Sequence, residues 1–121
     1  MKSRAYIINM TICLGVLLFA SCGKQYTAEQ TVKKFVQENT KEGIETKRLG
    51  FGDIGTTRHI TDSLVQKMRK NSNELFKNEI KYATMPEGEV YYLRMRYIHK
   101  GDTLQSTFYL DSELKEVVAF K

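Results

Sequence analysis

Residues 89–99 read EVYYLRMRYIH, and their alternating pattern decides the fold of the chain. Side chains along a β-strand point to opposite faces in turn, so a repeat of two residues indicates a strand with one buried face. One face would carry Tyr91, Leu93, Met95 and Tyr97. The other would carry Tyr92, Arg94, Arg96 and Ile98. The pattern predicts a strand that packs one face on helices and exposes its arginine face to solvent.

Two further strands are predicted after this one. Lys100-Gly101-Asp102 has the composition of a hairpin turn, with a glycine that can adopt positive φ. Residues 103–110 would form the return strand, Asp111-Ser112-Glu113 a second turn, and residues 115–120 a third strand. The carboxy-terminal part of the chain is therefore predicted to be an antiparallel meander.

An amphipathic helix is predicted ahead of the sheet, from about Ala28 to Glu42. Residues 27–30 have the form of a capping box. Apolar residues then recur at helical spacing, at Ala28, Val32, Phe35 and Val36. Lys33 and Lys34 fall on the opposite side, where two lysines are more typical of a solvated helix face than of a phosphate site.

A second helical region is predicted over residues 62–82, with Thr61 or Asp62 as its N-cap. Its apolar positions are Leu64, Val65, Met68, Leu75, Phe76 and Ile80. Asn71-Ser72-Asn73 is a weak middle, so the pattern leaves open one long kinked helix or two short ones. The turn over residues 85–88 ends the helical region.

Residues 44–59, between the two helical regions, are expected to form a short irregular strand. The letters Gly50-x-Gly52-x-x-Gly55 match a dinucleotide-binding fingerprint, but no βαβ unit surrounds them. They indicate a glycine-rich strand edge or bulge instead.

No catalytic residue, metal site or cofactor is predicted. His59, Asp62 and Ser63 lie close in sequence, but a nucleophile, a base and an orienting acid meet in space and not by adjacency. They are expected to be a loop histidine and capping residues. His59 and His99 are isolated, so no spacing typical of metal ligands exists.

The elements together predict a single α+β domain. Two helices, the second long or kinked, would pack on one face of a three- to four-stranded antiparallel sheet with a C-terminal meander. The exposed face would present Tyr92, Arg94 and Arg96, with Tyr109 on the neighbouring strand. These four residues are the candidate binding patch, because arginine stacked on tyrosine can receive a carboxylate or a phosphate. The alternative is that the same pairs only stabilise the sheet across its strands.

The first 22 residues have the three parts of an export signal. Met1-Lys2-Ser3-Arg4 is positively charged, residues 5–19 are largely apolar, and Ala20-Ser21 are small residues before Cys22. An uncleaved membrane helix, or a secretory signal cut elsewhere, are the alternatives. The apolar run is at the short limit of the roughly 20 residues that a membrane span needs.

Phe19-Ala20-Ser21-Cys22 resembles a lipobox, the processing site of bacterial lipoproteins, although leucine is commoner than phenylalanine at its first position. The resemblance implies a signal peptide over residues 1–21, lipidation of Cys22, a tether over residues 22–26 and a domain over residues 27–121. It implies a membrane anchor of several acyl chains, including palmitate, which holds a protein stably. Gly23 after the cysteine implies the outer membrane. Gly23-Lys24-Gln25-Tyr26 lacks the acidic cluster that resembles a surface-export tag, which implies the periplasmic face.

Charge and cysteine content limit the partners. Removing Lys2 and Arg4 from the 19 basic residues leaves 17 against 14 acidic ones, a net charge of +3. This mild excess does not have the clustered basic footprint of a nucleic-acid binder. Cys13 lies in the leader and Cys22 would carry the lipid, so no disulfide is expected.

The order of elements resembles small, uncharacterised Bacteroidota lipoproteins of the cystatin-like or NTF2-like α+β class. The resemblance depends on Phe51-Gly52-Asp53-Ile54, Ile60-Thr61-Asp62-Ser63, Tyr91-Tyr92-Leu93-Arg94 and Phe108-Tyr109-Leu110-Asp111. It implies an anchored, non-enzymatic binding or interaction module of the cell envelope, with the bilayer and an envelope protein as partners. The alternatives are a cystatin-like inhibitor or immunity protein, or a small-ligand pocket protein or hydrolase. For the hydrolase, His59, Asp53 and Arg94 would have to line one cavity.

Overall fold

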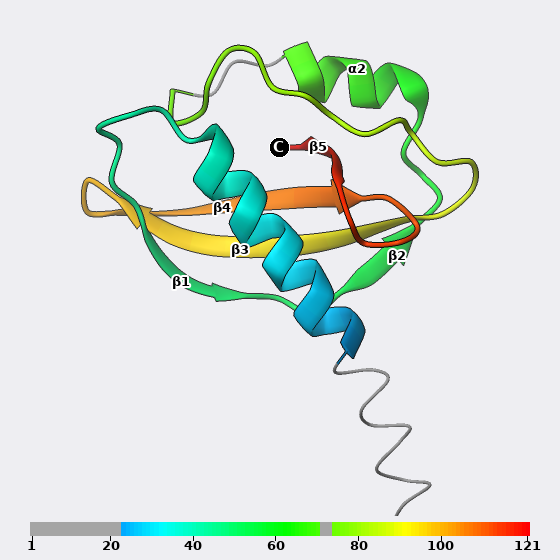
Figure 1. Ribbon diagram of the computed structural model, residues 1–121, viewed down its shortest axis with the longest axis horizontal. Helices are drawn as coiled ribbons and strands as arrows, with labels where there is room; N and C mark the ends of the chain where they lie inside the picture. The colour runs from blue at the N-terminus through cyan, green and yellow to red at the C-terminus, as the bar shows by residue number, and fades with distance from the viewer. Residues whose placement is uncertain (1–22, 71–73) are drawn as a thin grey trace, which may run out of the picture.

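The computed structural model describes residues 23–70 and 74–121, and these residues form an α+β fold. A helix over residues 23–39 crosses in front of an antiparallel sheet (Figure 1). The strands are β1 (Lys47–Phe51), β2 (Gly55–Thr57), β3 (Val90–His99), β4 (Asp102–Leu110) and β5 (Val117–Phe120), and the second helix is α2 (Asp62–Lys70). The predicted fold class is confirmed. The export signal over residues 1–21, Cys22 and Asn71-Ser72-Asn73 lie outside the described residues.

The long β3–β4 hairpin forms the centre of the sheet. The strand order is β1-β3-β4-β5, and β2 also pairs with β3. Because β4 occupies one edge of β3, both β1 and β2 pair with the other edge, β1 opposite residues 95–98 and β2 opposite residues 90–92. The described residues thus hold five strands, whereas three to four were expected. The register of β1 shifts between Arg48 and Gly50, which confirms the predicted glycine-rich irregularity.

Two local turns define the meander as predicted. Lys100 and Gly101 both have positive φ, 50° and 80°, which is the conformation of a two-residue type I′ hairpin. In the second turn, Asp111 Oδ1 accepts hydrogen bonds from the backbone N–H groups of Lys115 and Glu116, at 2.8 and 3.2 Å. Leu114 in this turn has φ of 60° and is buried, so its side chain closes one end of the core.

The N-terminal helix packs on one face of the sheet through the first core cluster. Its buried members are Ala28, Val32, Phe35, Leu75, Phe76, Leu93, Met95, Tyr97, Phe108, Leu110, Leu114, Val117 and Phe120. At its centre, the Phe108 ring stacks on Phe120 at 5.5 Å between ring centroids, and Phe35 meets both rings edge-on. Burying one such side chain is worth about 1.5–3 kcal/mol, so these rings stabilise the helix–sheet interface strongly.

Helix α2 belongs to a second core cluster, formed by Val65, Met68, Val90, Tyr109, Val118 and Ala119. Phe108 and Tyr109 are adjacent on β4, so their side chains point to opposite faces, and each belongs to a different cluster. The two helices therefore cover opposite faces of the sheet, whereas the pattern led us to expect both on one face. Arg69 fastens α2 in place, because its guanidinium donates to the carbonyls of Val118 and Ala83 at 3.0 and 2.7 Å.

The N-terminal helix occupies residues that were predicted as a cap and a tether. Residues 23–26 are helical, and the Thr27 hydroxyl donates to the Gly23 carbonyl, 2.8 Å away, from within the helix. The first turn is held by Gln25, whose Nε2 donates to the Gly52 carbonyl while its Oε1 accepts from the Ile54 N–H. Packing against the β1–β2 connection thus extends the helix by more than a turn beyond the predicted start.

The predicted second helix over residues 62–82 is confirmed over residues 62–70 and wrong over residues 74–82, which are not helical. Leu75 and Phe76 are buried, as their apolar character suggested, but their backbone pairs with the end of the N-terminal helix. The N–H of Lys41 donates to the Leu75 carbonyl, and the N–H of Lys77 donates to the Asn39 carbonyl. These non-local hydrogen bonds replace the local ones of a helix. Neither helix within residues 23–70 and 74–121 has the length and apolar character of a membrane span.

Candidate functional site

The four residues of the candidate patch lie on the sheet face that α2 covers in part. Tyr92 on β3 is opposite Tyr109 on β4, and Arg94 is opposite Thr107. Arg94 and Arg96 are exposed, Tyr92 is half-buried and Tyr109 is buried, 6% exposed. The sheet face therefore changes from apolar beneath α2 to cationic along β3, and the tyrosines lie at the boundary.

A shallow pocket of about 270 Å³ lies at this boundary, and we call it the Arg94 pocket. It is lined by Thr56, Thr57, Ile60, Tyr92, Arg94, Thr107, Tyr109 and Lys121. Three of the four predicted patch residues thus converge on one concave site. Arg96 shares the face but does not line the pocket. Arg96 lies two residues further along β3, where its neighbours in the sheet are Gln105 of β4 and Gly50 of β1.

The shape of the pocket depends on Gly55 of β2, which lies directly opposite Tyr92. The Tyr92 ring lies across this glycine so closely that a Cβ atom there would be 2.5 Å from its Cζ atom. The guanidinium of Arg94 in turn lies over the Tyr92 ring, 5.4 Å from its centroid. A glycine on β2 therefore positions the ring, and the ring positions the cation.

The Arg94 pocket is electropositive in its side chains. Arg94 and Lys121 line it, no acidic side chain does, and neither cation forms an ion pair within residues 23–70 and 74–121. The hydroxyls of Tyr92 and Tyr109 make no hydrogen bond with other described residues. Guanidinium and hydroxyl donors around a small concavity suit a carboxylate or a phosphate group.

Sequence reasoning missed the residues that β2 and the end of the chain bring to this pocket. Thr56 and Thr57 lie 65 and 64 residues before Lys121 in the sequence, so only the sheet topology unites them. One feature of the sequence could have indicated the role of β2, namely Gly55, the third glycine of the run Gly50-x-Gly52-x-x-Gly55. A glycine followed by two β-branched residues is typical of a strand that admits a neighbour's side chain.

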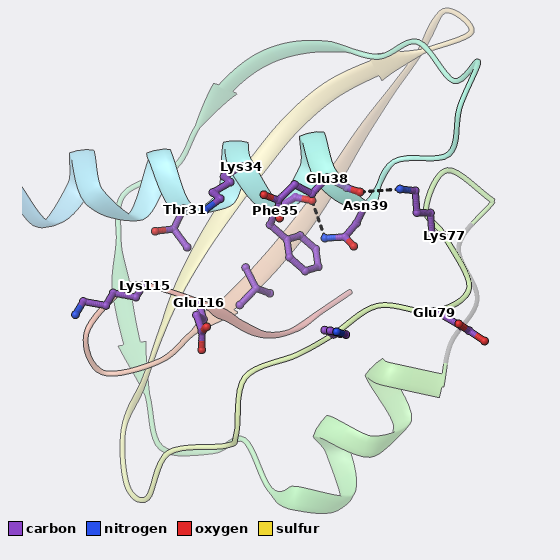
Figure 2. Close-up of a pocket in the computed structure, with 11 residues that line it drawn as sticks. Thr31, Lys34, Phe35, Glu38, Asn39, Lys77, Glu79, Lys115 and Glu116 are labelled. Carbon is purple, nitrogen blue, oxygen red and sulfur yellow. Dashed lines mark hydrogen bonds between the residues drawn. The ribbon is translucent and has the colours of Figure 1, made fainter.

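A second, larger cleft of about 450 Å³ lies beside the N-terminal helix (Figure 2). Its charged lining residues are Lys34, Glu38, Lys77, Glu79, Lys81, Lys115 and Glu116. Lys77 Nζ donates to the Glu38 carbonyl at 3.0 Å, and Asn39 Nδ2 donates to the Phe35 carbonyl at 2.9 Å. Lysine and glutamate are mixed in this lining, so the cleft has no strong preference for the sign of a ligand's charge.

The residues considered for catalysis do not share the Arg94 pocket. The Arg94 pocket is lined by neither His59 nor Asp53. The backbone of His59 donates to the Thr57 hydroxyl, and Thr61 caps α2 by accepting from the Leu64 N–H at 3.2 Å. Thr61 was one of the two predicted caps. No group of three or more potential metal ligands occurs within the described part of the chain.

Comparison with protein-family models, with curated proteins and with solved structures found no match to this chain. The site is therefore defined by the geometry of the molecule alone. That geometry offers a pocket lined by the cationic side chains of Arg94 and Lys121 on one face of the sheet, and aromatic rings fill the centre of the helix–sheet interface.

Proposed function

We propose that this protein is a lipid-anchored, non-enzymatic binding module of the cell envelope, held at the periplasmic face of the outer membrane. The observation that carries the binding role is the convergence of Tyr92, Arg94 and Tyr109 on one pocket without an acidic side chain. The anchor is supported by the export signal and by the lipobox that ends at Cys22.

The ligand we propose is a carboxylate or phosphate group carried by a partner molecule. A guanidinium matches the two oxygens of either group, and the surrounding threonine and tyrosine hydroxyls can satisfy the remaining lone pairs. A pocket of about 270 Å³ is small for a whole metabolite but sufficient for such a group at the end of a side chain. The site is therefore suited to capturing a protruding group on a larger partner.

The N-terminal helix connects the proposed anchor at Cys22 to the strand that lines the Arg94 pocket. Gln25 ties the first turn of the helix to the β1–β2 connection, and β2 supplies Thr56 and Thr57 to the pocket. A lipid on Cys22 would thus be separated from the folded domain by no long flexible segment. The pocket would be presented at a restricted height above the membrane.

Affinity capture from an envelope extract tests the binding role. Full-length protein with Arg94→Ala is compared with the Arg96→Ala variant, which removes the same side chain from the same strand face outside the pocket. We expect a defined partner that wild type and Arg96→Ala retain and Arg94→Ala loses. Loss in both variants, or in neither, would contradict a site centred on Arg94.

The anchor is tested independently with Cys22→Ser. We expect metabolic labelling with a palmitate analogue to disappear, and the protein to leave the membrane fraction or accumulate with its leader attached. Retention of the label in this variant would disprove lipidation at Cys22.

A further inference from the structure

A basic groove of about 680 Å³ lies between the N-terminal helix and β1, on the sheet face opposite the Arg94 pocket. Figure 1 shows β1 running beside this helix. The helix contributes Gln30, Lys33, Lys34, Val36 and Gln37, the β1 side contributes Thr46, Lys47 and Arg48, and Met95 of β3 also lines the groove. Two segments that are separate in the sequence therefore form one concave surface.

Four of the nine lining residues are cations, and none is acidic. Lys33, Lys34, Lys47 and Arg48 form no ion pair within residues 23–70 and 74–121. Two of them are drawn toward one aromatic ring, since Lys33 Nζ lies 5.9 Å and the Arg48 guanidinium 5.6 Å from the centroid of Phe51. The Phe51 ring thus holds the positive charges of Lys33 and Arg48 close together, although the two charges repel each other.

The nearest carboxylates do not neutralise this groove. Glu29, one helical turn before Lys33, accepts a hydrogen bond from Gln25 instead. Glu38, one turn after Lys34, lines the mixed-charge cleft of Figure 2 together with Lys34, but it does not line the groove and forms no ion pair with another described residue. Glu45 forms no ion pair with another described residue. The groove therefore keeps an unbalanced positive charge, which a bound anion would relieve.

We propose that this groove binds a ligand with several phosphate charges, either on a lipid headgroup or on a soluble phosphate ester. The arginine can hold two phosphate oxygens, and the lysines act as point charges around it. The glutamine and threonine side chains can complete the hydrogen bonds. Charges on an edge strand also discourage edge-to-edge pairing, but that role does not need two further lysines on the helix that faces the strand.

The first test uses the full chain in dodecyl maltoside micelles, titrated with sodium tripolyphosphate in a calorimeter. We expect saturable binding that Lys33→Gln/Arg48→Gln weakens about 25-fold, at about fivefold for each cation near an anionic ligand. The matched control is Lys67→Gln/Lys70→Gln, which removes the same charge from exposed positions on α2. This control should change the affinity by no more than about twofold. Circular dichroism melts verify that both variants fold.

The second test distinguishes the two sources of phosphate. The full chain is placed in nanodiscs of phosphatidylcholine, with or without phosphatidic acid, and lysine acetylation rates are measured by mass spectrometry. Slower acetylation of Lys33 and Lys47 with phosphatidic acid, and unchanged rates at Lys67 and Lys70, would assign the groove to a lipid headgroup. The same protection by tripolyphosphate alone, in phosphatidylcholine discs, would assign it to a soluble phosphate compound.

The proposal is overturned if neither phosphate source protects the groove lysines. It is also overturned if the groove variant and the α2 control weaken tripolyphosphate binding equally, since the effect would then come from net charge alone. Both results leave the Arg94 pocket unaffected, because that site lies on the other face of the sheet.

Discussion

Replacing Gly55 by alanine should destabilise the domain through a single contact. The new Cβ would lie 2.5 Å from Cζ, 2.6 Å from the hydroxyl oxygen and 2.8 Å from Cε1 of Tyr92. Carbon atoms pack at about 3.5–4.0 Å, so the ring has to move by roughly 1 Å. Overpacking of this kind costs about 1–3 kcal/mol. Because the end of a rotatable side chain can yield, we expect about 1–2 kcal/mol, measured by urea unfolding of the full chain.

A double-mutant cycle isolates this contact. With Tyr92→Ala in place, the clash is absent, and Gly55→Ala should instead stabilise the protein by about 0.4–1 kcal/mol through a less flexible unfolded chain. The expected interaction energy between the two sites is then about 1.5–3 kcal/mol. Gly50→Ala is the matched control, because a Cβ at Gly50 would meet no heavy atom within 4 Å. It should be neutral or stabilising in both backgrounds.

If Gly55→Ala costs the same with and without the Tyr92 ring, the close approach of ring and backbone is not the source of the effect, and the predicted clash is refuted. The same variant also tests the site. Displacing the ring should weaken capture of a partner that depends on Arg94, because the guanidinium lies over that ring.

Gln25→Ala should lower the free energy of unfolding by about 1–2 kcal/mol, because two hydrogen bonds to the β1–β2 connection are lost. Urea titration measures the change, and an unchanged midpoint would contradict the docking. Lys100→Asn should raise the stability by about 0.5–1 kcal/mol, since Asn-Gly suits the two positive φ angles of this turn, and a lower melting temperature would argue against it. Stability should fall as the pH rises above about 10, because burial raises the pKa of Tyr82, although Arg69 lowers it in part. The unfolded phenol then loses its proton first, which favours unfolding, and Tyr82→Phe should flatten this part of a pH–stability profile.

The central hairpin of the sheet was predictable because residues close together in the sequence determine it. Alternation along residues 89–99 assigns each side chain to a face, and the Lys100-Gly101 turn sets the partner of every residue on the return strand. The fold class, the hairpin and the grouping of Tyr92 with Arg94 on one face follow from these two features.

The segment over residues 74–82 was not predictable for the opposite reason. Leu75, Phe76 and Ile80 have the spacing of a helix, and they do contact the core, but their backbone partners lie in the N-terminal helix and the loop after it. The spacing of apolar residues indicates which side chains are buried. It does not indicate which distant backbone groups form hydrogen bonds with the backbone of the segment. The contributions of Thr56 and Lys121 to the Arg94 pocket escaped prediction likewise, because each depends on strand order.

The register of β3 with its two edges also has a consequence for the order of folding. On one edge, His99 meets Asp102 across a two-residue turn, so the β3–β4 hairpin closes a very short loop. On the other edge, Ile98 meets Lys47, a partner 51 residues earlier in the chain. Closing the longer loop costs more chain entropy, so we expect the hairpin to form first and to act as the template. The N-terminal helix and β1, which together build the basic groove, would then be the last elements to assemble.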